Sequence, residues 1–258
     1  TPCGTLFPYT TLFRSYFLIL SALMSILLVV RHTRVDEQAG RAELMRANVV
    51  GAHAPLAAAL IVSVITNLVA SVLVAGIMIG YGYEAESALL FGLSIGAIGL
   101  AFAGVAAFTA QVSEHSRAAA GFAGAILGAA FVFRGVGDMA RIGGSTLSWF
   151  SPLGWGSQTA PFVLNRWWPL ALAIGFAALL SALGFALSTR RDVGAGLMPA
   201  KSGRPRALPS LRSPLSLACR LQRSAILWWG GALAVSGFMF GAFSDAMTAA
   251  ADIQTLAE

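Results

Sequence analysis

Seven charged side chains lie close together near the start of the chain, in the segment RHTRVDEQAGRAELMRAN (31–48). If residues 34–50 form a helix, Glu37 lies one turn before Arg41 and can pair with it along one helix face. An apolar stripe follows the same spacing, formed by Val35, Ala39, Ala42, Met45 and Val49. Gly40 interrupts this pattern and predicts a bend or break. The segment is either an interfacial connecting helix or a docking surface for a partner.

The sequence has no residue pattern typical of a catalytic or metal site. The histidines His32, His53 and His115 are isolated from one another, and Cys3 and Cys219 have no neighbours at ligand spacing. A glycine-rich stretch at 137–146 lacks the lysine of a phosphate-binding loop. We therefore expect no catalytic residue, no cofactor, no metal and no enzyme activity in this chain.

The composition predicts an integral membrane protein. Of the 258 residues, 57% are hydrophobic and 11% are charged, whereas a soluble domain carries about 25% charged residues. The net charge is +6, and 8 of the 17 basic residues lie in the segment 189–223 beside apolar stretches. This placement favours anionic lipids over nucleic acid as the partner of that segment.

Apolar stretches predict an all-α, polytopic transmembrane helical bundle, because about 20 apolar residues cross the hydrocarbon as a helix. About six membrane segments are expected, at 16–30, 54–80, 87–110, 118–137, 167–188 and 224–243. Glycines spaced four apart inside these segments allow close packing of helices. They are Gly76 and Gly80, Gly92 and Gly96, Gly124 and Gly128, and Gly237 and Gly241.

Few polar residues interrupt the predicted spans, and none of the four complete spans has an ionisable residue near its middle. Arg134 and Asp138 lie four residues apart near the outer end of one span and can form an ion pair. Thr66 and Asn67 lie deep in another span. They either line a polar path or hydrogen-bond a neighbouring helix, and we favour the second interpretation.

The distribution of Arg and Lys sets the expected orientation in a bacterial plasma membrane. The segments 31–53, 111–117 and 189–223 are expected in the cytoplasm, and 81–86 and 138–166 outside. Aromatic residues typical of a membrane interface gather near the outer side, at Trp149, Phe150, Trp155, Trp167 and Trp168.

Residues 1–15 contain FPYTTLFRS, which resembles a peptide that recurs when sequencing-adapter DNA is translated. We expect this segment to be non-native and the native chain to begin near Tyr16. We also expect the chain to be an internal fragment of a longer protein.

From Tyr16 onward the chain resembles bacterial ABC exporter permeases, especially the actinobacterial polyketide-antibiotic exporters. The resemblance rests on several stretches: RHTRVDEQAGRAELMRANVVGAHAPLAAAL, LSWFSPLGW (147–155), RWWPLALA (166–173), RRDVGAGLMPAKSGRPRA (190–207) and LRSPLSLACRLQR (211–223). It implies that 16–188 is most of a first permease half. Segment 189–223 would be a cytoplasmic basic linker with an elbow helix, and 224–258 the start of a second half.

The resemblance also implies a role for the charged segment. Exporters of this type carry a coupling helix that seats in a separate ATPase subunit, and its motif matches Glu37, Gly40, Arg41, Glu43 and Leu44. The expected function is ATP-driven export of a hydrophobic or drug-like substrate, of the kind that confers antibiotic resistance. Two alternatives from other classes are an ion-coupled secondary transporter and a non-transporting membrane scaffold.

Overall fold

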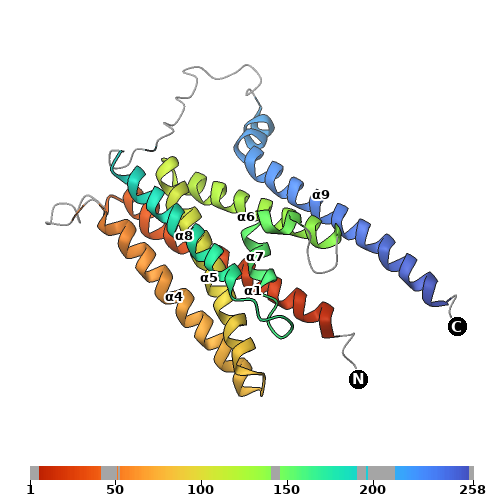
Figure 1. Cartoon of the computed structure of the whole chain (residues 1–258). Helices are drawn as coiled ribbons and strands as arrows, with labels where there is room; N and C mark the ends of the chain where they lie inside the picture. The colour runs from red at the N-terminus through yellow and green to blue at the C-terminus, as the bar shows by residue number, and fades with distance from the viewer. Residues whose placement is uncertain are drawn as a thin grey trace. The chain divides into compact units, whose positions relative to one another are not determined.

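A computed structural model of the chain describes residues 6–41, 51, 53–140, 146–190, 196 and 213–255. The chain divides into two compact units, Thr1–Ala200 and Lys201–Glu258, and each is described by itself. Every element within the described residues is a helix (Figure 1).

The first unit is built from long helices joined by short connections. The chain begins with α1 (Leu6–Val30), which passes directly into a π-helix η1 (Arg31–Val35) and a short α2 (Asp36–Gln38). The other elements that the structure describes in this unit are α4 (Ala54–Gly80), α5 (Ala85–Val112), α6 (Ser116–Ala140), η2 (Thr146–Phe150), α7 (Pro152–Gln158) and α8 (Trp168–Ser188).

Five helices within the described residues are long and apolar enough to cross a membrane. They cover Arg14–Gln38, Ala54–Gly80, Ala85–Val112, Ser116–Asp138 and Trp168–Ser188. Each overlaps one of the first five predicted segments, and the all-α, polytopic fold class is confirmed. Helix α1 begins at Leu6 and continues past Tyr16, the position near which we expected the native chain to begin.

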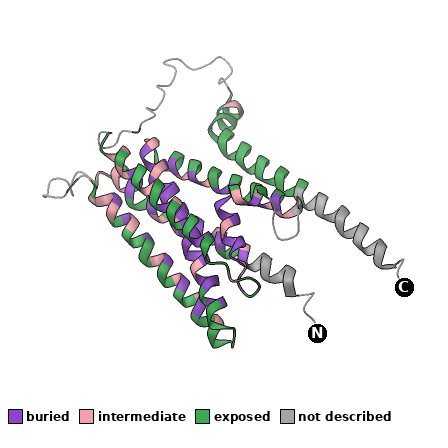
Figure 2. Cartoon of the chain, viewed as in Figure 1, coloured by how far each residue is buried: buried purple, intermediate pink, exposed green. Residues whose placement is uncertain are grey.

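Helix α5 is the centre of the first unit. It packs against α1, α4, α6, α7 and α8, and buried residues run along most of its length (Figure 2). The physical reason is its composition, because its many Ala and Gly residues let the surrounding helices approach closely.

Glycines set the closest contacts between α5 and its neighbours. A Cβ on Gly96 would lie 3.0 Å from the carbonyl oxygen of Asn67, and one on Gly104 would lie 2.8 Å from that of Ala177. Gly92 likewise packs against the Ser71 carbonyl on α4. Of the four predicted glycine pairs, only Gly92 and Gly96 therefore lie at such a helix contact, while the other six glycines face open space in their own units.

Helix α4 buries one narrow face against this centre. The buried positions recur at spacings of three and four, as expected for one face of a helix: Leu56, Ala59, Ser63, Asn67, Ser71 and Ala75. Its other faces are exposed and apolar (Figure 2), which is typical of a helix surrounded by lipid or by further membrane helices.

The predicted outer loop, 138–166, contains a buried helix. In α7, Leu153 is fully buried, and Gly156 packs against Leu18 of α1 and Ile98 of α5. The aromatic residues of this region form a group beside α7: the Trp149 and Trp168 rings stack at 4.7 Å, and the Trp155 indole N–H donates to the Trp149 carbonyl. This loop is therefore part of the packed bundle.

In the second unit, the described residues form one long helix, α9 (Pro214–Thr255). It joins the predicted elbow helix, 214–223, to the predicted sixth span, 224–243, without interruption. Part of that span has side chains outside the described residues, so its role in crossing the membrane stays a prediction.

Candidate functional site

The motif that resembles a coupling helix begins in α2, at the end of the continuous helical stretch formed by α1, η1 and α2. We use the name coupling segment for residues 36–41, the part of this motif that the structure describes. Glu37 lies in α2, and Gly40 has a φ of +73°. A positive φ is the conformation in which glycine commonly ends a helix, so the helix predicted at 34–50 is broken at Gly40. Glu43 and Leu44 lie outside the described residues.

This break changes the ion pairs that the sequence predicted. Arg41 pairs with Asp36 at 2.9 Å, and Glu37 pairs with Arg34 at 2.8 Å. The prediction that Glu37 pairs with Arg41 assumed an uninterrupted helix. Because Gly40 turns the backbone, Arg41 no longer lies above Glu37 on the helix.

Sequence reasoning missed Arg34, which lies just before the coupling segment. Its side chain is completely buried. Its guanidinium donates to the backbone carbonyl of Ala110 in α5 and to the carboxylate of Glu37. A signal for its burial is present in the sequence, because Arg34 continues a stripe of buried residues spaced four apart along α1: Leu18, Ala22, Ile26 and Val30.

Described residues from the three segments predicted to be cytoplasmic, or next to them, lie at one end of the first unit. The Ser116 hydroxyl donates to Gln38 at 2.6 Å, joining the coupling segment to α6. His53, before α4, lies 2.9 Å from the hydroxyl of Ser188 at the end of α8. Gly196 packs against the α5–α6 turn at Ser113 and Glu114. The helices therefore alternate in direction, as the predicted topology requires.

Asn67 lies at the centre of a buried hydrogen-bond cluster between α1 and α4. Its amide group donates to the Ser25 hydroxyl at 2.9 Å and to the Ser63 carbonyl at 2.9 Å, and its Oδ1 accepts from Ser21 at 2.9 Å. Within the described residues, the Thr66 hydroxyl donates to the Val62 carbonyl on its own helix and to no other helix. The structure thus places Asn67, but not Thr66, in contact with a neighbouring helix.

We expect Asn67→Ala to destabilise the intact protein by about 1–2 kcal/mol, because hydrogen bonds across membrane helices contribute on that order. Thr66→Ala is the matched control and should change stability little, since Thr66 holds no second helix. Thermal unfolding in detergent measures both variants. Equal effects of the two substitutions would show that the cluster does not hold α1 to α4.

Arg134 and Asp138 lie where the sequence placed them, near the end of α6, with Nε and Oδ2 separated by 3.3 Å. Arg134 is buried and also donates to the Ser15 hydroxyl of α1 at 2.8 Å. Asp138 accepts from the hydroxyl of Ser148 in η2 at 3.3 Å. The pair therefore connects α6 to α1 and to the buried loop.

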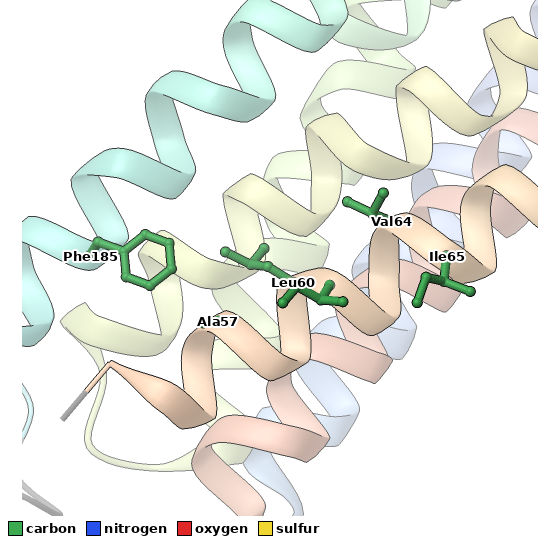
Figure 3. Close-up of a pocket in the computed structure, with 6 residues that line it drawn as sticks. Ala57, Leu60, Val64, Ile65 and Phe185 are labelled. Atoms are coloured by element: carbon green, nitrogen blue, oxygen red, sulfur yellow. The ribbon is translucent and has the colours of Figure 1, made fainter. Parts of the chain in front are cut away.

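An open apolar pocket of about 290 Å³ lies between α4 and α8, near the end of the bundle that holds the coupling segment (Figure 3). Its lining is entirely hydrophobic, from Ala57, Leu60, Ile61, Val64 and Ile65 on α4 and Phe185 on α8. The ring of Phe185 also contacts the ring of His53 at 5.7 Å. The pocket can accept only an apolar group, because none of these side chains has a hydrogen-bonding atom.

The five apolar helices of membrane-spanning length among the described residues indicate a multi-pass membrane protein. Comparison with known proteins gives the kind of membrane protein. Residues 211–258 match the family described as the C-terminal domain of the multidrug efflux system permease Rv1217c. The chain is also 40% identical over 222 residues to the multidrug efflux system permease protein Rv1217c of Mycobacterium tuberculosis.

This second match covers 86% of the chain and 40% of the mycobacterial protein. The two matches confirm the resemblance to actinobacterial exporter permeases that the sequence indicated. The chain spans less than half the length of that relative, so the activity, substrates and partners of the whole protein are matters of proposal.

Proposed function

We propose that this chain is part of the permease subunit of an ATP-driven ABC exporter. The observation that carries the proposal is the 40% identity to a multidrug efflux permease over 86% of the chain. The proposed substrate is hydrophobic or drug-like, and the apolar pocket between α4 and α8 has lining of matching chemistry. The substrate would leave the cell as the helices of one half tilt against the other.

In this proposal a separate ATPase subunit hydrolyses ATP and docks on the coupling segment. The exposed Arg41, whose side chain is 69% accessible, is available for such a contact. Glu43 and Leu44 would extend the docking surface, and the basic segment 189–223 would face anionic lipid on the same side of the membrane.

Co-purification tests the proposal against its alternatives. The intact permease, expressed with the protein encoded beside it, should retain an ATPase with a phosphate-binding loop through affinity purification. An ion-coupled transporter or a scaffold requires no such subunit. If the purified protein transports a drug without any ATPase and in response to an ion gradient, the proposal is wrong.

A further inference from the structure

The complete burial of the Arg34 side chain has a large free-energy cost, because a charged group is removed from water. A charged side chain that is buried in a protein costs several kcal/mol unless it is paired and hydrogen-bonded. Arg34 has 0% exposed surface and lies at the point where α1 leads into the coupling segment. Its position calls for an explanation beyond packing.

On α5, Arg34 binds the C-terminal end of the helix, where the last backbone carbonyls have no donor within the helix. Helix α5 ends at Val112, so the carbonyl of Ala110 is among the last four, which have no donor within the helix. The end of a helix also carries a partial negative charge. The Arg34 Nε–H group donates to this carbonyl, and its positive charge complements the helix dipole.

The same guanidinium also holds the coupling segment. Its NH1 group donates to Glu37 at 2.8 Å while Nε is bonded to Ala110. A planar guanidinium can serve two acceptors in fixed directions, which a lysine ammonium does with less geometric control. Arg34 therefore joins the coupling segment and the central helix through a single side chain.

The backbone at Arg34 is unusual in a way that fits this role. Residues Arg31–Val35 form a π-helix, a rare conformation that is frequent at functional sites. The π-helix lies directly before the coupling segment, and in it Arg34 and Thr33 are both buried. A second contact, from Ser116 to Gln38 at 2.6 Å, joins the coupling segment to the start of α6.

We propose that Arg34 is a positioning residue that makes the coupling segment and the α5–α6 turn move together during transport. The inference rests on the proposed function and extends it. A displacement of residues 36–41 by the ATPase is passed through Arg34 to the end of α5. Because α5 contacts every other long helix of the first unit, the displacement reaches the whole bundle.

The first test replaces Arg34 by glutamine in the intact permease with its ATPase. Arg31→Gln is the matched control, since Arg31 lies in the same π-helix but is exposed and outside the coupling segment. We expect Arg34→Gln to retain ATPase binding and ATP hydrolysis but to lose substrate export, and Arg31→Gln to export normally. Export at the wild-type level by Arg34→Gln overturns the inference.

A second test does not depend on the folding of the Arg34 variant. Gln38→Cys and Ser116→Cys are introduced together, in a background from which all other cysteines, Cys219 included, have been removed, and joined by a short bifunctional thiol reagent. If the two segments move together, the cross-linked protein keeps its export activity, and the cross-link restores export to Arg34→Gln. Loss of export on cross-linking the protein with Arg34 intact shows that the segments must separate, and overturns the inference.

These outcomes distinguish the inference from the function on which it rests. If no ATPase co-purifies with the unmodified permease, the proposed function fails before any variant is measured. If the ATPase binds but export is insensitive to Arg34→Gln, only the role of Arg34 is wrong. Single-cysteine variants treated with the same reagent control for modification at one site.

Discussion

Arg41→Ala and Glu37→Gln in the intact permease are expected to reduce substrate export while ATP hydrolysis continues. Arg41 pairs with Asp36 at an exposed position, and exposed pairs contribute only about 0–1 kcal/mol to stability. Its loss should therefore affect docking and leave folding intact. Free energies that couple two sites are about 1–3 kcal/mol, so the affinity of docking should fall by about 5- to 150-fold. Export should fall with it.

The two variants act by different physical routes. Glu37→Gln removes the charged partner of the buried Arg34, so it should weaken both docking and the contact with α5. Transport into inverted vesicles, divided by ATP hydrolysed, measures the coupling in each variant. Arg31→Gln serves again as an exposed control. Export at the wild-type level by both Arg41→Ala and Glu37→Gln would show that this segment does not couple ATP to transport.

Gly96→Leu should prevent correct packing of α4 against α5. Even a Cβ at this position would lie 3.0 Å from the Asn67 carbonyl and closer still to the Ser71 hydroxyl. Overpacking of a tight core costs about 1–3 kcal/mol, and occasionally more. We expect a strong loss of folded protein, because the same displacement also separates the hydrogen-bond cluster around Asn67.

Gly128→Leu is the matched control for this substitution. Gly128 lies on α6 and is exposed, and a Cβ added there would have no atom of its own unit within 4 Å. Yield of monodisperse protein after detergent extraction measures both variants. If Gly96→Leu and Gly128→Leu give equal yields, the close contact between α4 and α5 is not required for folding.

The positions of the membrane helices could be predicted from the sequence, because an uninterrupted stretch of about 20 apolar residues is enough to indicate one. The predicted segments 54–80 and 167–188 agree with α4 and α8 to within one residue at each end. The buried helix α7 could not be predicted in the same way, because seven residues are too few to cross a membrane. Its signal is local: Pro152 at the first turn, and Gly154 and Gly156 where neighbouring backbone or side chains come close.

The candidate site could be predicted only in part. Charge and spacing located the segment at 31–48, and polarity within an apolar span singled out Thr66 and Asn67 together. These signals did not separate Asn67 from Thr66. They did not identify Arg34, because a charged residue near a helix end normally extends to water. Which residue is buried there depends on the π-helix and on the packing of α1 against α5, which brings Arg34 to the Ala110 carbonyl.

Site-specific photo-cross-linking tests the central claim most directly. A photoreactive amino acid at Ala39, an exposed position in the coupling segment, is compared with one at Tyr81, which is 83% exposed at the opposite end of α4. In intact cells that express the whole transporter, the probe at Ala39 should cross-link to the ATPase subunit and the probe at Tyr81 should not. A cross-link from Tyr81, or none from Ala39 in an assembled complex, would contradict the account.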